Sequence, residues 1–317
     1  MSGLALVVIV KLWLIRRYHN SNLSQGVTFL RVLSGRGAPF SLLTPATGEA
    51  EEESAGTLAI TGVVFASLLS VLTFLPCLAA EIAPGDRRSA YADMSRESKA
   101  MQDDDTANPA MLWVLDGETL WQRKEGSAGK SCADCHGDAR TSMKGVAARY
   151  PAFNAARARP VDLGERINIC RTEQQRATPL AFESKELLAL AAYIGQQSRG
   201  MPIEIADDAR MRPFLQAGQD MFTGRQGQLN LSCAQCHDDN WGQKLAGAAI
   251  PQGHPTGYPL YRLEWQTLGS LQRRLRNCLF GMRAVSYPYG APDYVNLELY
   301  LMWRARGMRV ETPAVRP

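Results

Sequence analysis

The pentapeptide Cys-x-x-Cys-His occurs twice in this chain, at residues 132–136 and 233–237. Two thiols three positions apart lie on one helical turn, where they can form thioethers with the two vinyl groups of a haem. The histidine that follows can supply one axial nitrogen to the iron. The residues predicted to attach haem are Cys132, Cys135, Cys233 and Cys236, with His136 and His237 as axial ligands.

A bare Cys-x-x-Cys pair is also typical of a dithiol redox site or of half a zinc site. Here each pair has its own histidine, and the chain has only two other histidines, His19 and His254. Four of the seven cysteines belong to the two motifs. The pattern therefore predicts two covalently bound haem c groups.

Haem is attached to such motifs outside the cytoplasm, so the chain needs an export signal. The run Gly56–Ala80 is uncharged and mostly apolar, and a polar stretch follows it from Glu81. Cleavage near Ala79 or Ala80 fits a secretory signal peptide. We therefore expect the protein to lie in the periplasm.

The sequence before this run complicates that interpretation. Acidic residues 51–53 stand where a signal peptide has positive charge, and a second apolar stretch, Leu4–Ile15, lies farther upstream. Two apolar segments leave a membrane anchor open, because Gly56–Ala80 is long enough to span a bilayer. We expect instead that the first fifty-odd residues precede the true start of translation. Cys77 would then be removed with the signal.

The net charge indicates which classes of macromolecule the chain could bind. The formal net charge of the whole chain is +4 at pH 7. Such a mild excess is compatible with docking to acidic proteins and gives no support for binding nucleic acid.

Residues recur in two halves of the chain at matching places around the haem motifs, which indicates an internal duplication. The matching pairs are Gly117 and Gly218, Trp121 and Phe222, Tyr150-Pro151 and Tyr258-Pro259, Arg166-x-x-x-Cys170 and Arg274-x-x-x-Cys278, Tyr193 and Tyr300, and Gly200-Met201 and Gly307-Met308. We expect an N-terminal extension with the signal peptide at 1–83, a first domain at 84–204 and a second, catalytic domain at 205–317. The boundary falls near Pro202 to Asp208.

The expected secondary structure is mostly helical. Amphipathic helices are predicted before the haem motifs, at residues 110–122 and 212–222, and terminal helices after them, at residues 184–199 and 293–306. The first terminal helix begins at Ser184 or Glu183 and ends at Gly200. The second is capped by Asp293 and ends at Gly307. Irregular loops such as residues 247–259 would wrap a haem. The fold class is therefore two tandem cytochrome c-like domains in which the first and last helices cross.

The second axial ligand of each iron decides the chemistry. Methionine is usual in cytochromes c and raises the potential. The candidates are Met143, Met201, Met221, Met282, Met302 and Met308. Met201 and Met308 are equivalent in the repeat, but each follows a glycine that ends a helix, so packing at the helix end explains them equally well.

Cys170 and Cys278 are the rival candidates, and they are also equivalent in the repeat. Buried free thiols, or a disulfide between the two, remain open as alternatives. Arginines surround both positions and would stabilise a thiolate, which is the form that binds iron. They are Arg166 and Arg171 in the first half, and Arg273, Arg274, Arg276 and Arg283 in the second. On a helix, Arg274 lies four residues before Cys278 and so on the same side.

At these residues the chain resembles a known family. The C-terminal part of the chain is similar to the signature of the SoxA family. The matching residues are Arg274-x-x-x-Cys278, Arg283-Ala284, Tyr294, Leu297-Glu298-Leu299-Tyr300-Leu301 and Trp303-Arg304-Ala305-x-Gly307. Residues 100–105, Asn108-Pro109 and Cys170-Arg171-Thr172-Glu173 extend the resemblance to nearly all of the chain after the signal. Because both haem motifs are present, it resembles the dihaem branch.

This resemblance implies a function and a set of roles. SoxA is the catalytic cytochrome of the periplasmic SoxAX complex, which couples thiosulfate oxidatively to a cysteine of the carrier protein SoxYZ and passes electrons through haem to SoxX. His136 and Cys170 would ligate the first iron, and His237 and Cys278 the second. Cys278 would carry a persulfide and act as the catalytic sulfur, and Arg274 would bind thiosulfate. From the residues alone, a dihaem electron carrier or peroxidase with methionine ligands remains the alternative.

Overall fold

The computed structural model describes residues 82–317. The expected signal peptide at Gly56–Ala80, the upstream stretch Leu4–Ile15 and Cys77 lie outside the described residues. Between residues 82 and 317, no helix is long and apolar enough to cross a membrane. We refer to residues 84–204 as the first half and to residues 205–317 as the second half.

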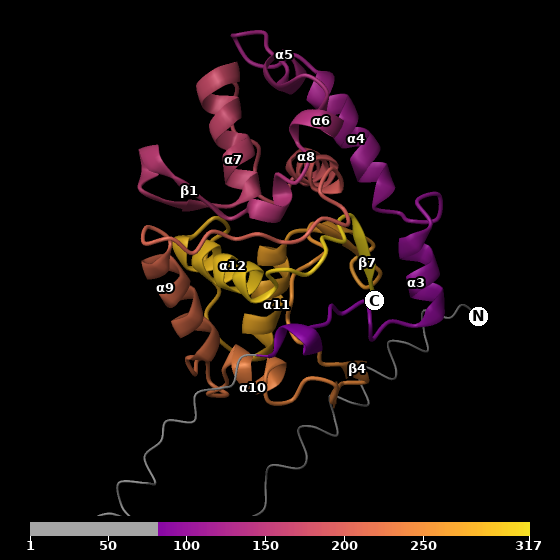
Figure 1. Cartoon of the computed structure of the whole chain (residues 1–317), viewed down its shortest axis with the longest axis vertical. Helices are drawn as coiled ribbons and strands as arrows, with labels where there is room; N and C mark the ends of the chain where they lie inside the picture. Colours follow the sequence, from indigo (N-terminus) through magenta and orange to yellow (C-terminus); the bar gives the residue numbers. More distant parts are fainter. Residues whose placement is uncertain (1–81) are drawn as a thin grey trace, which may run out of the picture. The chain divides into compact units, whose positions relative to one another are not determined.

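Helices dominate both halves, as predicted (Figure 1). The helices of the first half are α3 (Arg96–Asp103), α4 (Met111–Gln122), α5 (Cys132–His136), α6 (Ala139–Ser142), α7 (Leu163–Cys170) and α8 (Lys185–Gln196). Those of the second are α9 (Arg212–Thr223), α10 (Cys233–His237), α11 (Leu271–Gly281) and α12 (Pro292–Arg304). The order of helix, haem motif, loop and terminal helix is therefore used twice.

The first and last helices of each half cross in close contact, α4 with α8 and α9 with α12. The crossings centre on Gly117 and Gly218. A Cβ atom at Gly117 would collide with the backbone oxygen of Ala189, and one at Gly218 with that of Asn296. Only glycine permits the two backbones to approach this closely.

One turn beyond each glycine, an aromatic pair completes the crossing. Trp121 meets Tyr193 edge-on with ring centroids 6.0 Å apart, and Phe222 meets Tyr300 at 5.6 Å. All four side chains are buried. Tilted and edge-on aromatic contacts of this kind stabilise a core beyond the area that they bury.

The predicted start is confirmed in one terminal helix and differs in the other, and neither helix ends at the predicted glycine. Helix α8 ends at Gln196 and α12 at Arg304, before Gly200 and Gly307. Ser184 caps α8 by accepting a hydrogen bond from the backbone N–H of Leu187 at 3.3 Å. The prediction that Asp293 caps α12 was wrong. The helix begins one residue earlier at Pro292, so Asp293 lies in the first turn, where its charge still complements the helix dipole.

Three small sheets that were not predicted from the sequence lie outside the predicted helices. They pair β1 (Ala152–Asn154) with β2 (Arg159–Val161), β3 (Lys244–Leu245) with β4 (Ala248–Ala249), and β5 (Leu260–Arg262) with both β6 (Thr267–Gly269) and β7 (Ala314–Arg316). Strands of two or three residues are too short to show alternation in the sequence. The third sheet packs on the core of the first half, where Tyr261 meets Trp113 edge-on at 5.8 Å.

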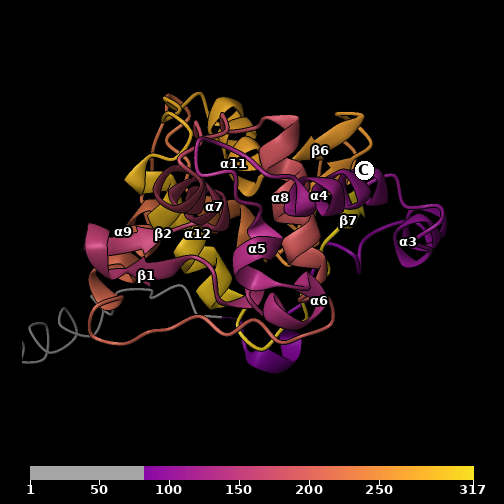
Figure 2. The ribbon, with the colours of Figure 1, turned by 90° about the horizontal axis from the view of Figure 1, so that it is seen from above.

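The two halves are joined along their terminal segments. The backbone of residues 200–203 pairs with that of residues 307–310, for example through Ile203 N–H to Met308 O at 2.9 Å and Val310 N–H to Met201 O at 2.9 Å. Near the C-terminus, β7 lies beside α3 (Figure 1). Seen from above, α3 and β7 again lie close together, next to α4 (Figure 2).

The helix crossings generate the first prediction. Gly117→Ala and Gly218→Ala should each lower the free energy of unfolding by about 1–3 kcal/mol, the usual cost of overpacking. Gly281→Ala is the matched control, because no atom lies within 4 Å of the place that its methyl group would take, and the change should stabilise by about 0.5–1 kcal/mol. Urea titration followed by circular dichroism measures all three, and an unchanged stability of Gly218→Ala would contradict the crossing.

Candidate haem and thiolate sites

Each haem motif folds as a one-turn helix that is fixed at its N-terminus by a reciprocal pair of hydrogen bonds. Ser131 accepts from the backbone of Asp134 at 3.0 Å, while Asp134 accepts from the backbone of Ser131 at 2.8 Å. Ser232 and Gln235 make the same exchange at 3.2 and 2.8 Å. This capping box holds the two thiols and the histidine of each motif in one helical turn.

The first thiol of each motif lies in a desolvated space. Burial raises the pKa of Cys132 to about 11 and that of Cys233 to about 12. In both cases the next largest contribution comes from the other candidate sulfur of the same half, Cys170 or Cys278. Because the interaction between two charges weakens with distance, sulfurs that interact in this way lie near each other. Each motif therefore faces the predicted cysteine of its own half.

Helices α7 and α11 carry these two cysteines. Cys170 is the last residue of α7, and Cys278 lies in the last turn of α11. The thiol of Cys135 interacts electrostatically with that of Cys170, and Cys236 with Cys278. The two cysteines are half-buried and free, so the structure has no disulfide between them. The structure thus brings together Cys132, Cys135 and Cys170 in one half, and Cys233, Cys236 and Cys278 in the other.

The two axial histidine candidates have different surroundings. Nδ1 of His237 lies 2.6 Å from the carbonyl oxygen of Pro251, which can only accept, so Nδ1 carries the proton and Nε2 is left free to bind a metal. Burial lowers the pKa of His237, which keeps the ring neutral. His136 is exposed and lies 5.8 Å from the ring of Trp121. In the described chain its ring makes no hydrogen bond.

Arginine and tyrosine accompany each cysteine. Arg166 lowers the pKa of Cys170 against the larger, raising effect of burial, and it also acts on Tyr150. In the second half, the phenol of Tyr258 interacts with both Arg274 and Cys278, and burial raises the pKa of Tyr258 to about 12. The sequence showed this tyrosine only as part of a repeated Tyr-Pro pair. Its place beside the cysteine was missed, although its recurrence in both halves was a usable signal.

Three of the other arginines near the cysteines have partners elsewhere. Arg273 stacks over Trp265 at 4.4 Å, and Arg276 stacks over Tyr289 at 4.7 Å and donates to the Tyr287 carbonyl. In the first half, Arg171 pairs with Glu125 at 3.6 Å and donates to the Thr178 carbonyl. Arg274 differs from these, because among residues 82–317 its guanidinium has neither a hydrogen bond nor an ion pair.

The two methionines that are equivalent in the repeat lie in the segments that join the halves. Met201 and Met308 lie in the paired segments 200–203 and 307–310 that join the halves, and Met308 packs against the buried cluster there. Met201 also contacts Gly145, where an added Cβ would lie 3.0 Å from its methyl group. Both methionines therefore lie in the segments that join the two halves.

The two cysteine-bearing helices meet where the halves join. Asp162 caps α7 and accepts a hydrogen bond from Gln272 of α11 at 2.8 Å. Ser270, which caps α11, donates its backbone N–H to Glu183 at 3.2 Å. Burial raises the pKa of both Asp162 and the neighbouring Glu298. These contacts fix the start of each helix, and with it the position of the cysteine at the other end.

The donor sets suit a covalently attached haem better than a bare metal ion. Across the described residues, no three or more side chains of histidine, cysteine, aspartate or glutamate group closely enough to hold an ion. Each half instead offers two thiols and a histidine on one turn, with one more sulfur opposite. A haem needs two thioether positions and one or two axial ligands. The residues present therefore fit haem c.

Comparison with known proteins agrees with this geometry. The family model of the SoxA/TsdA cytochrome c domain matches residues 116–203 and again residues 217–310. The L-cysteine S-thiosulfotransferase subunit SoxA of Pseudaminobacter salicylatoxidans is 40% identical over 221 residues, which cover 69% of this chain and 77% of that protein. The chain belongs to the SoxA family.

Further members of the SoxA family match similarly. The subunit of Rhodovulum sulfidophilum is 36% identical, covering 72% of this chain and 80% of that protein. The crystal structure of SoxXA from P. pantotrophus matches with a TM-score of 0.70 and 31% identity, covering 73% of this chain and 87% of that one. Membership in a family of cytochrome c domains means that this chain binds haem c covalently.

Within this SoxA-family chain, the two matched regions differ by one residue in the turn that follows Cys170 or Cys278. Arg176 and Arg283 both have left-handed backbone conformations, with φ of 56° and 54°, and each adjoins a glycine that no other residue could replace, Gly126 or Gly227. Arg176 follows its cysteine by six residues, and Arg283 by five. The π-helical turn Arg171–Gln175 accommodates the extra residue in the first half.

Proposed function

We propose that this chain is the catalytic subunit of an L-cysteine S-thiosulfotransferase, which couples thiosulfate oxidatively to a cysteine of the carrier protein SoxYZ. The single observation that carries the proposal is the position of Cys278, which faces the thiols of the second haem motif with Tyr258 and Arg274 beside it. Its partner subunit would be SoxX, which receives the electrons. The names of the SoxA relatives and the SoxXA assembly support both assignments.

Two haems would be held, one in each half, in domains bounded at 84–204 and 205–317. Cys132 and Cys135 attach the first and Cys233 and Cys236 the second. His136 and Cys170 are the proposed axial ligands of the first iron, and His237 and Cys278 those of the second. Because this attachment occurs outside the cytoplasm, we assign the chain to the periplasm.

The reaction joins the outer sulfur of thiosulfate to the sulfur of the carrier cysteine. One S–S bond forms, the carrier thiol loses its proton, and two electrons leave. Haem c supplies a one-electron acceptor, from which the electrons pass on to SoxX. Cys278, which the family resemblance implies carries a persulfide, would hold thiosulfate beside the acceptor while the bond to the carrier cysteine forms.

Electrostatics explain why the site needs a free cation. Thiosulfate is a dianion and a thiolate is an anion, so their approach is repulsive in a desolvated site. Arg274 lies on the same face of α11 as Cys278 and makes no other ion pair in residues 82–317. A guanidinium held there would offset the repulsion and orient the sulfurs for transfer. Arg166 is exposed, whereas Arg274 is half-buried, which favours the second half as the active one.

Substitution of the two equivalent cysteines should separate the roles of the halves. Cys278→Ala should abolish coupling while both haems stay attached, because attachment uses the four motif cysteines. Cys170→Met is the matched control, and it should change the spectrum of the first haem with a smaller loss of turnover. The measurement is turnover with thiosulfate, SoxYZ and SoxX, with haem content determined by intact mass. Near-normal turnover of Cys278→Ala would mean that the active site does not lie in the second half.

The equivalent arginines provide a second test. Arg274→Ala should reduce thiosulfate-dependent turnover by one to two orders of magnitude, since a lost charge-assisted contact is worth roughly 1.5–3 kcal/mol. Arg166→Ala occupies the same position in the first half and should have little effect on turnover. The thiosulfate dependence of the rate should show a raised KM for Arg274→Ala. Equal losses in both variants would mean that Arg274 has no special role in binding.

A further inference from the structure

A short N-terminal segment of the described chain lies across the second half rather than the first. We define residues 84–91, which precede α3, as the strap. Arg87 donates to the backbone carbonyl of Arg306 at 2.9 Å, and Ser89 donates to Glu311 at 2.5 Å. The strap thus begins the first half in sequence but is fastened to the far end of the second.

The strap is bound on its other side by Gln252. The side-chain amide of this residue donates to the backbone carbonyl of Asp86 at 3.0 Å and accepts from the backbone N–H of Arg88 at 2.8 Å. Gln252 is only 2% exposed. Two hydrogen bonds from one buried side chain to a distant backbone fix the loop of residues 250–256 against the strap.

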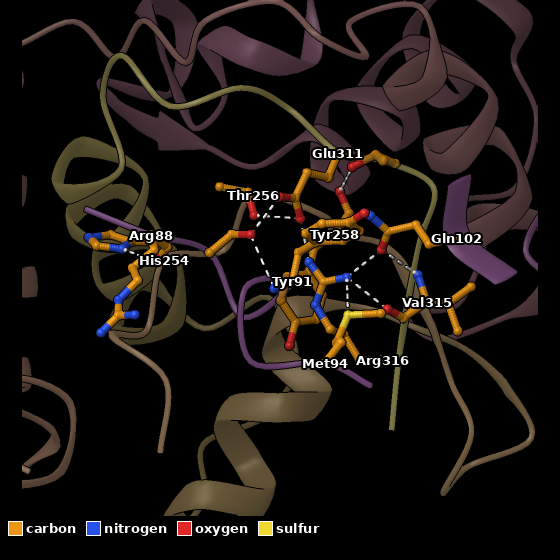
Figure 3. Close-up of polar contacts among 12 residues, drawn as sticks. Arg88, Tyr91, Met94, Gln102, His254, Thr256, Tyr258, Glu311, Val315 and Arg316 are labelled. Atoms are coloured by element: carbon orange, nitrogen blue, oxygen red, sulfur yellow. Dashed lines mark hydrogen bonds and ion pairs between the residues drawn. The ribbon is translucent and has the colours of Figure 1, made fainter. Parts of the chain in front are cut away.

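His254 adds a second clamp to the same loop. Its Nδ1 donates to the backbone carbonyl of Arg88 at 3.0 Å, and Figure 3 shows the two residues side by side. Burial lowers the pKa of His254 to about 4, so the ring stays neutral near neutral pH. The side chain of Arg88 turns away and stacks over Trp241 at 4.5 Å.

The clamped loop is also the one that orients His237. The residues on either side of Gln252 both touch the imidazole of His237. Pro251 accepts the hydrogen bond from Nδ1 at 2.6 Å, and the backbone of Gly253 packs on the ring, because an added Cβ would lie 3.2 Å from Cγ. Gln252 therefore sits between the two contacts that set the direction of the ring.

We propose that the strap and Gln252 form a positioning device for His237, so that the start of the first half tunes the second haem. This proposal rests on the proposed function in one respect, the role of His237 as axial ligand. A strong Nδ1–H bond to a carbonyl raises the basicity of a ligating imidazole and fixes its orientation. More basic ligation stabilises the oxidised iron, so the device should lower the reduction potential of the second haem.

The first half lacks such a device. His136 is exposed, and within residues 82–317 its ring has no hydrogen-bond acceptor. The two halves are thus alike in their helices and different in how they support the axial histidine. The difference falls in the half to which we assign the catalytic cysteine.

Gln252→Met tests the proposal in the haem-loaded complex with SoxX. Methionine keeps the length of the side chain and removes both hydrogen bonds to the strap. Gln102→Met is the matched control. Gln102 is also buried, at 9% exposed, and also fastens the N-terminal part of the chain to a distant segment, by accepting from Val315 N–H at 3.1 Å and from Arg316. Figure 3 shows Gln102 and Arg316 on the side of the network away from His254.

Potentiometric titration of each haem, with thermal unfolding in parallel, gives the readout. We expect Gln252→Met to raise the potential of the second haem and leave the first unchanged, and Gln102→Met to lower the melting temperature without moving either potential. The milder Gln252→Asn, which shortens the side chain by one methylene, should shift the second potential in the same direction and serves if Gln252→Met does not fold.

Unchanged potentials in both Gln252 variants, or an equal shift in Gln102→Met, would overturn the positioning role and leave the strap as a structural clamp. Electron paramagnetic resonance of the unaltered complex separates this failure from that of the proposed function. If the second haem there lacks a histidine ligand, both proposals fall. If it has one and the Gln252 variants behave as wild type, only the strap proposal falls.

Discussion

The close approach of two helix backbones at Gly117 and Gly218 is the constraint on which the rest of the structure depends. Each crossing fixes the first and last helices of a half and leaves the intervening chain to form the haem motif, the loop and the cysteine-bearing helix. The aromatic pairs one turn away make the crossing rigid. These crossings let the thiols of each haem motif and the cysteine of the same half, Cys170 or Cys278, lie around a desolvated space in that half.

The halves share this frame and differ in what surrounds the iron site. The second half has a hydrogen-bonded His237, a half-buried Arg274 without another partner in the described chain, and Tyr258 beside its cysteine. The first half has an exposed His136 and a π-helical turn after its cysteine. In the proposed function both halves hold a haem, and these differences suit the second half to substrate chemistry as well.

Much of this arrangement could be predicted from the sequence, because the decisive features are local or repeated. The haem motifs and the four crossing helices follow from spacing, whereas the pairing of each motif with its own cysteine was implied only by the resemblance to the SoxA family. The cap at Asp293 was misplaced because Pro292 is itself a favourable first helical residue. The short strands had no periodicity to detect. The contacts of Gln252 join residues more than 160 positions apart, so nothing in the neighbouring sequence indicates them.

The central claim is that the sulfur of Cys278 is an axial ligand of the iron in the second haem. Near-infrared magnetic circular dichroism of the resting ferric protein, with both haems at full occupancy, tests it most directly, because thiolate and thioether ligands give distinct bands. We predict histidine–thiolate ligation at both irons, and loss of that signature from the second haem alone in Cys278→Met. A methionine–haem band at full occupancy in the unaltered protein would contradict it.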